Sequence, residues 1–170
     1  LCKFRAENTA RKYKIIGLTS AGNKAFVEGL GACDEVLTYD AVEALQNVPS
    51  VYVDMAGNAE VKLRLHEHLA DNVKHSAAVG TSHWDKFAQP VNMPGAKPKF
   101  FFAPAQIAKR REEWGAGVIE RRITDAWKRI ASDADWMKLV TQQGLAAALP
   151  VYDALARGKA NPRDGHVIVL

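Results

Sequence analysis

The sequence predicts an α/β protein, with a parallel sheet in the first hundred or so residues and a helical segment after it. Short apolar stretches alternate with stretches of helical periodicity up to residue 103, which is typical of a parallel sheet built of βαβ units. After Pro104 the pattern changes to helices. We therefore divide the chain into a sheet domain, 1–103, and a C-terminal segment, 104–170.

The elements of the first domain follow from periodicity and from the residues that end them. Residues 1–12 resemble the later turns of a helix, and 23–31 has helical spacing closed by Gly31. The helix 59–70 places Val61, Leu65 and Leu69 on one face, and 41–48 predicts a short helix before Pro49. Strands are predicted at 14–18, 34–39, 50–58 and 73–79, with a further apolar segment at 99–104.

The C-terminal segment is expected to be mainly helical. An apolar stripe opposite Arg and Lys predicts one long helix, and it consists of Ile119, Ile123, Trp127 and Ile130. Ser132 can N-cap a following helix with Trp136, Leu139 and Val140 facing inward. A helix at 149–158 and a terminal strand at 165–170 complete the chain.

Composition limits the classes of function. The 170 residues carry a net charge of +4, and the positive charges are interspersed with acidic ones, as on solvated helix faces. We therefore expect no nucleic-acid partner. No apolar run approaches the roughly 20 residues of a membrane helix, so no membrane partner is expected. Cys2 and Cys33 form no CxxC motif, and a reduced, cytoplasmic setting is the expectation.

Polar residues follow several of the predicted strands. Thr19 and Ser20 come after the first, Asp54, Gly57 and Asn58 lie at the end of the third, and Gly80 and Thr81 follow the fourth. Open parallel sheets bind ligands at the carboxyl ends of their strands. Such turns also serve purely local needs, so this pattern leaves a ligand crevice and ordinary turns as alternatives.

The first of these turns favours one class of ligand. NAD sites usually end the second strand of the sheet in Asp or Glu, which accepts hydrogen bonds from the adenosine ribose. Here Thr19 and Ser20 hold that position, and Asn23 and Lys24 begin the next helix. Hydroxyl and ammonium groups suit a 2′-phosphate, which predicts NADP(H). For Lys24 the alternative is an exposed helix lysine.

Three segments resemble a known family: "IIGLTSAGNKAFVEGLGACDEVLTYD", "VYVDMAGN" and "AAVGTSHWD". They are similar to the cofactor domain of zinc-independent, quinone reductase-like medium-chain dehydrogenase/reductases. The closest resemblance is to a little-characterised family of that branch, similar also in "PKFFFAPAQIAKRREEWG" and "DALARGKANPRDGHVIVL". The resemblance covers nearly the whole chain.

The resemblance implies residue roles and a fold. A Lys after the second strand and a Tyr ending the third hold the adenosine 2′-phosphate in quinone reductases, which implies these roles for Lys24 and Tyr39, with Ser20 assisting. Asp54, Gly57 and Asn58 would border the ribose and nicotinamide, and Gly80 and Thr81 the next strand end. The fold implied is an incomplete Rossmann-type sheet, with the first strand, the phosphate loop and a preceding substrate domain absent. The final strand would return to that domain.

Other candidate sites are weaker. His66 and His68 are two residues apart on a helix and cannot easily share a metal ion, so we expect exposed helix histidines and no metal site. His83 and Asp85 could line the crevice or cap a loop. The four tryptophans are expected to pack helices.

The predicted function is NADP(H)-dependent, zinc-independent hydride transfer to a carbonyl, enone or quinone, in a full-length context. The partners would be a small-molecule substrate and, as an open point, a second copy in a homodimer. No catalytic residue is assigned. The alternative is a non-enzymatic nucleotide-sensing or protein-interaction module on the same scaffold.

Overall fold

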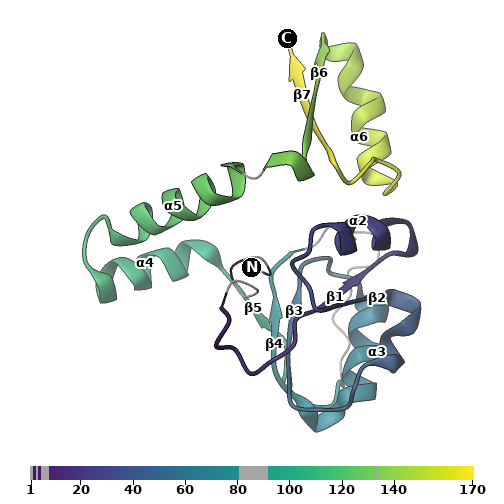
Figure 1. Cartoon of the computed structure of the whole chain (residues 1–170), viewed down its shortest axis with the longest axis vertical. Helices are drawn as coiled ribbons and strands as arrows, with labels where there is room; N and C mark the ends of the chain where they lie inside the picture. Colours follow the sequence, from purple (N-terminus) through teal and green to yellow (C-terminus); the bar gives the residue numbers. More distant parts are fainter. Residues whose placement is uncertain (1, 3, 5–7, 81–91, 133) are drawn as a thin grey trace.

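The structure is a computed structural model that describes residues 2, 4, 8–80, 92–132 and 134–170 (Figure 1). Strands and helices alternate along the chain, and every strand pairing is parallel. The strands are β1 (Ile16–Thr19), β2 (Glu35–Thr38), β3 (Ser50–Asp54), β4 (Val73–Ala78), β5 (Lys99–Phe100), β6 (Lys138–Gln143) and β7 (Asp164–Val169). The α-helices are α2 (Lys24–Gly29), α3 (Ala59–Leu69), α4 (Ala103–Trp114), α5 (Val118–Ser132) and α6 (Ala148–Ala156). The short 3-10 helices are η1 (Ala21–Asn23), η2 (Tyr39–Ala44), η3 (Ala70–Asn72), η5 (Ala134–Trp136) and η6 (Leu145–Ala147).

The strands form three small sheets, with the orders β1-β2, β3-β4-β5 and β6-β7. Parallel neighbours need a crossover connection, and α2, α3 and α6 provide it between β1 and β2, β3 and β4, and β6 and β7. The predicted α/β class, with small parallel sheets and helices, is confirmed.

The hydrophobic core lies between α3 and the rest of the first domain. Its fully enclosed members are Val42, Val61, Leu65, Leu69 and Val73. Five partly buried side chains pack against it, and they are Leu18 of β1, Tyr39 of η2, Leu45, Tyr52 of β3 and Ala96. The apolar stripe at i, i+4 and i+8 on α3 thus faces the interior, as its spacing predicts.

Most elements of the first domain lie close to their predicted positions. The predicted strands contain β1 to β4, apart from the last residue of β1, and the predicted helix 59–70 contains α3. Gly31 follows the end of α2 with a φ of +61°, a left-handed conformation that glycine adopts without steric cost.

Two predicted helices of this domain differ from the structure. Of the predicted helix 1–12, Cys2 and Phe4 are helical as expected, whereas residues 8–12 form turns and irregular structure. Asn8 explains part of this, since its side-chain oxygen accepts a hydrogen bond from the Ala10 amide at 3.2 Å and competes with helical pairing. The helix expected at 41–48 is instead the 3-10 helix η2, which begins at Tyr39 and contains a non-helical Ala41.

The C-terminal segment is less helical than predicted. α5 matches the expected long helix, but the helix expected after Ser132 is wrong, because residues 138–143 form β6. Val140 and Thr141 favour strands, and β6 pairs along its whole length with β7. Leu139, expected to face inward, is 65% exposed.

β7 is the predicted terminal strand, and β6 is its partner in the described structure. Figure 1 shows β6, α6 and β7 as one βαβ unit at the end of the molecule remote from α3, with α4 and α5 side by side below it. No helix among the described residues is both long enough and apolar enough to cross a membrane.

The position of the core gives a direct test. Leu65 is 3% exposed, so Leu65→Ala should lower the free energy of unfolding by about 2–5 kcal/mol, because burial is lost and a cavity remains. Leu149 on α6 is 74% exposed and is the matched control, with an expected change below about 0.5 kcal/mol for Leu149→Ala. Urea unfolding followed by circular dichroism measures both. Equal losses would contradict this placement of the core.

Candidate functional site

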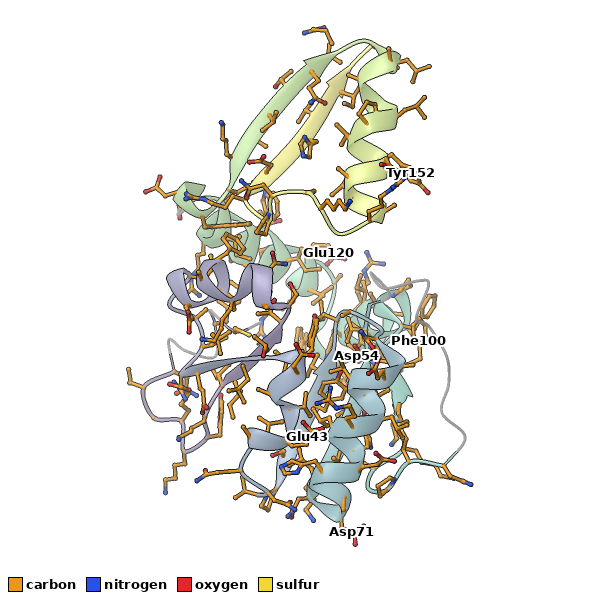
Figure 2. The ribbon with its side chains drawn as sticks, turned by 90° about the vertical axis from the view of Figure 1, so that its right-hand side faces the viewer. Glu43, Asp54, Asp71, Phe100, Glu120 and Tyr152 are labelled. Atoms are coloured by element: carbon orange, nitrogen blue, oxygen red, sulfur yellow. The ribbon has the colours of Figure 1, made fainter. Side chains whose placement is uncertain are left out.

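The candidate site is the set of carboxyl ends of β1, β2, β3 and β4. A cavity of about 2080 Å³ opens beside them, and among its lining residues are Tyr39, Asp54 and Asn58. Figure 2 shows Asp54 within the first domain, whereas Tyr152 of α6 lies on the C-terminal βαβ unit. Ligands of open parallel sheets bind at this end of the strands.

At the end of β1 the backbone turns directly into η1. Thr19 is buried, with 8% exposed, and Ser20 is exposed and precedes η1 with extended backbone angles. The Ser20 carbonyl accepts from the Asn23 amide at 3.0 Å, which closes the turn. The Ser20 hydroxyl makes no capping bond. This turn carries hydroxyl groups where an NAD site usually carries an acid.

Lys24 is the first residue of α2. Its ammonium group forms an ion pair with Glu28 one turn later, and the two side chains are 39% and 49% exposed. Such surface pairs contribute between about 0 and 1 kcal/mol. The free energy lost when Lys24 leaves Glu28 for a stronger anionic partner is therefore small.

Tyr39 follows β2 and begins η2, and its half-buried ring packs against the core. Burial raises the pKa of its hydroxyl, and the negative charge of Asp54 raises it further. The hydroxyl is therefore protonated at neutral pH and can donate a hydrogen bond.

The turn after β3 is held by the buried Asp54 carboxylate. Its Oδ1 accepts from the Gly57 amide at 2.8 Å and from the Ala56 amide at 3.2 Å. Gly57 adopts a φ of +73°, which a side chain would strain. One carboxylate thus fixes the path of the chain from β3 toward α3.

Asp54 also forms a buried ion pair with Lys62 of α3. The distance between Lys62 Nζ and Asp54 Oδ2 is 3.0 Å, and each side chain is only 3% exposed. Oδ2 has no partner in hydrogen-bond geometry, so the contact is an attraction between charges. Burial, and then the charge of Asp54, raises the pKa of the neighbouring Tyr52.

Asn58 is the N-cap of α3. Its Oδ1 accepts from the Glu60 amide at 3.1 Å and from the Val61 amide at 3.2 Å. These bonds satisfy two of the amide groups that a helix start leaves unpaired. The Asn58 side chain has a structural role that holds α3 in place, and its oxygen is already engaged.

The end of β4 lies against the same turn. A Cβ atom at Gly80 would lie 2.1 Å from the Met55 carbonyl oxygen, so only glycine permits this approach. The Val79 and Gly80 amides both donate to the Asp54 carbonyl, at 2.9 and 3.1 Å. Thr81, His83 and Asp85 lie outside the described residues.

The prediction for the histidines of α3 is wrong in part. His66 is fully buried, with Nε2 at 3.1 Å from the Ser76 hydroxyl and Nδ1 at 2.9 Å from the Pro94 carbonyl. His68 is partly buried, and its Nε2 donates to the Leu45 carbonyl at 2.7 Å. His66 follows Leu65 on the face of α3 that packs inward, and this explains its burial.

The structure brings together only some of the predicted residues. Tyr39, Asp54 and Asn58 line the cavity. The predicted residues that are described but do not line it are Thr19, Ser20, Asn23, Lys24, Gly57 and Gly80. Asn23 ends η1 directly before Lys24 and forms no side-chain cap.

Sequence reasoning missed Lys62. The signal was present, because the buried residues of α3 follow the spacing i, i+1, i+4, i+5 and i+8. They are Val61, Lys62, Leu65, His66 and Leu69. This two-row pattern is typical of a helix with a wide buried face, and polar members of such a face need partners.

A family model described as "Protein of unknown function (DUF2855)" matches residues 2–161. The chain belongs to this DUF2855 family. No curated protein and no solved structure matches the DUF2855 chain.

The buried ion pair predicts a large difference between two lysines. Lys62→Met leaves the Asp54 carboxylate buried without its partner and should lower the free energy of unfolding by about 3–5 kcal/mol. Lys24→Met removes the exposed pair with Glu28 and should cost less than about 1 kcal/mol. Urea unfolding measures both values.

The double variant Asp54→Asn/Lys62→Met separates charge from packing. It removes both buried charges together, so its loss should be smaller than that of Lys62→Met alone. The single variants Lys62→Met and Asp54→Asn each lower the free energy of unfolding by some amount. If the double variant lowers it by the sum of these two amounts, the two groups act independently, contrary to the geometry.

Proposed function

We propose that this protein is an NADP(H)-dependent, zinc-independent oxidoreductase of the quinone reductase or enoyl reductase type, active in a full-length context. The observation that carries the proposal is the end of β1. It presents Thr19 and Ser20 in place of an acid, and Lys24 begins the following helix. A carboxylate there would repel a 2′-phosphate, whereas hydroxyl and ammonium groups would bind it.

The pairing of the strands supports an incomplete Rossmann-type sheet. The two sheets of the first domain have the orders β2-β1 and β3-β4-β5, and both are parallel. One further strand between β1 and β3 would give the dinucleotide-binding order 3-2-1-4-5-6, with β1 as the second strand. In this arrangement the absent first strand is the central one, and the phosphate loop would follow it.

The residues at the strand ends fit the adenosine side of such a site. Lys24 would exchange Glu28 for the 2′-phosphate, Tyr39 would donate from its protonated hydroxyl, and Ser20 would assist. Asp54 and Gly57 would shape the wall beside the ribose and nicotinamide through the turn they form, together with Asn58. Gly80 and Thr81 would complete that wall.

The cofactor would supply hydride chemistry to a carbonyl, enone or quinone, and the protein would supply position and charge. Three of the described side chains near the site have structural roles: Lys62 pairs with Asp54, and Asn58 caps α3. We assign none of them a catalytic role.

A second candidate is a non-enzymatic nucleotide-sensing or protein-interaction module. It is favoured by apolar side chains on the surface where β5 leads into α4. Phe100 and Phe102 are 73% and 54% exposed, and their rings stack with centroids 6.2 Å apart. Exposed aromatic groups of this kind occur at binding surfaces. If the full-length protein binds neither NADPH nor NADH, this candidate replaces the enzyme.

The 2′-phosphate contact predicts a selective loss of affinity. Lys24→Ala or Tyr39→Phe in the full-length protein should weaken NADPH binding by about 10-fold or more, since a hydrogen bond to a charged group contributes roughly 1.5–3 kcal/mol. NADH binding should change little. Calorimetric titration of each variant with both nucleotides measures the difference, and equal weakening of both would show that the contact is misplaced.

The proposal also predicts how the 170-residue chain behaves alone. If the phosphate loop precedes residue 1, as the resemblance implies, this chain alone should bind NADPH weakly, because the pyrophosphate would lack its backbone donors. Isothermal titration of the chain tests this, and micromolar binding would refute it. The full-length protein should oxidise NADPH with a quinone acceptor.

A further inference from the structure

Two cysteines that lie far apart in the sequence meet in the fold. Cys2 is helical, and Cys33 lies between α2 and β2. Both are free and partly exposed, and their thiol groups are within hydrogen-bonding contact of each other. Both also line the cavity described above, so a small oxidant can reach them from solvent.

The position of Cys33 is fixed by its neighbours. The Asp34 amide donates to the Ile15 carbonyl at 2.8 Å. The Asp34 carboxylate accepts from the Ile15 amide at 2.7 Å and from the Arg11 guanidinium at 2.6 Å. A Cβ atom at Gly17 of β1 would lie 3.0 Å from the Cys33 sulfur, so the glycine leaves the room that this thiol occupies. Cys33 is therefore held against β1.

Cys2 is positioned from the other side. Phe4 lies under the guanidinium group of Arg129 on α5, with 4.9 Å between the guanidinium carbon and the ring centroid. Residues two apart on a helix point about 200° from one another, so Cys2 and Phe4 face nearly opposite ways. Phe4 thus contacts α5 while Cys2 reaches the start of β2.

The pair lacks the further ligands that a metal ion needs. Structural zinc sites have four ligands, and the described part of the chain contains no group of three or more His, Cys, Asp or Glu residues that could hold a metal ion. Asp34, next to Cys33, uses its two carboxylate oxygens for Arg11 and Ile15. Two thiols in contact without further ligands are suited to disulfide chemistry.

The two thiols differ in their surroundings. Burial, and then the neighbouring Cys2, raises the pKa of the Cys33 thiol to about 11. Cys33 therefore stays protonated at neutral pH, and a protonated thiol reacts slowly with oxidants. Cys2 is the sulfur that we expect an oxidant to attack first.

We propose that Cys2 and Cys33 form a reversible disulfide when the protein meets hydrogen peroxide. The peroxide transfers one oxygen to the Cys2 sulfur, which gives a sulfenic acid and water. Cys33 then loses its proton and attacks that sulfur. The S–S bond forms, and the hydroxyl group leaves with the proton as a second water. The thiols lose two electrons, the peroxide gains them, and a thiol such as glutathione reverses the reaction.

The bond would close a loop that contains β1 and α2. A disulfide stabilises such a loop mainly by limiting the freedom of the unfolded chain. Cys33 precedes β2 whereas Tyr39 follows it, so the bond would lie at the opposite end of the strand from the proposed nucleotide contact. The proposal is therefore independent of the oxidoreductase function.

The direct test treats the full-length protein with hydrogen peroxide, blocks free thiols with iodoacetamide and digests the product without reductant. Mass spectrometry should show the peptide containing Cys2 linked to the peptide containing Cys33, and dithiothreitol should separate them. Cys2→Ser and Cys33→Ser should each abolish the linked pair. If both cysteines stay free, or if either is oxidised to sulfinic acid without a linked pair, the proposal is wrong.

Two aromatic variants test how Cys2 is positioned. Phe4→Ala removes the ring under Arg129, so the effective concentration of the two thiols, measured in glutathione redox buffers, should fall about 2- to 5-fold. Trp114 of α4 makes the same kind of contact with Arg110 and Arg122, and Trp114→Ala should leave it unchanged. Circular dichroism checks that both variants are folded. Equal effects would reject this geometry.

Redox equilibrium also tests whether the fold brings the thiols together. The protein is equilibrated with reduced and oxidised glutathione, once in its native state and once unfolded in urea. The effective concentration of the two thiols should be at least about 10-fold higher in the native protein, because the structure holds them in contact. An equal or lower value in the native protein would overturn the proposal.

Discussion

The buried Asp54 carboxylate is the interaction on which the candidate site depends. It binds the Ala56 and Gly57 amides of its own turn and attracts Lys62 of α3 across 3.0 Å. Taking two charges out of water is costly unless each keeps its partner. The turn after β3 and the start of α3 are consequently fixed together, and the main-chain carbonyl of Asp54 holds Gly80 against the same turn. A rigid turn at the carboxyl end of a strand is suited to place backbone close to a ligand.

The second constraint is the parallel sheet itself. Parallel strands form their hydrogen bonds with neighbours distant in sequence, and a central strand needs one neighbour on each side. In the described structure the first domain has two short sheets whose edges border one cavity. The proposed nucleotide site lies at the carboxyl ends of these strands, where Tyr39 and Asp54 line the same cavity.

How much the sequence predicted depended on whether the signal was local. The strand–helix alternation up to β4 and the buried face of α3 are local patterns, and they were predicted well. The helix expected after Ser132 was wrong because β6 is stabilised by β7, which follows it at a distance through α6. Burial of His66 depends on Ser76 and Pro94, which are brought to it by the fold. The ion pair of Lys62 likewise required the end of β3 to lie against α3.

The central claim is that the ends of β1 and β2 recognise a 2′-phosphate on adenosine. The most direct measurement compares two fragments of the cofactors, adenosine 2′,5′-bisphosphate and adenosine 5′-monophosphate, by NMR titration of the isotope-labelled protein. The account predicts that the bisphosphate shifts the amide signals of Ser20, Lys24 and Tyr39 and that the monophosphate leaves them nearly unchanged. Equal shifts with both fragments, or shifts confined to other parts of the chain, would contradict it.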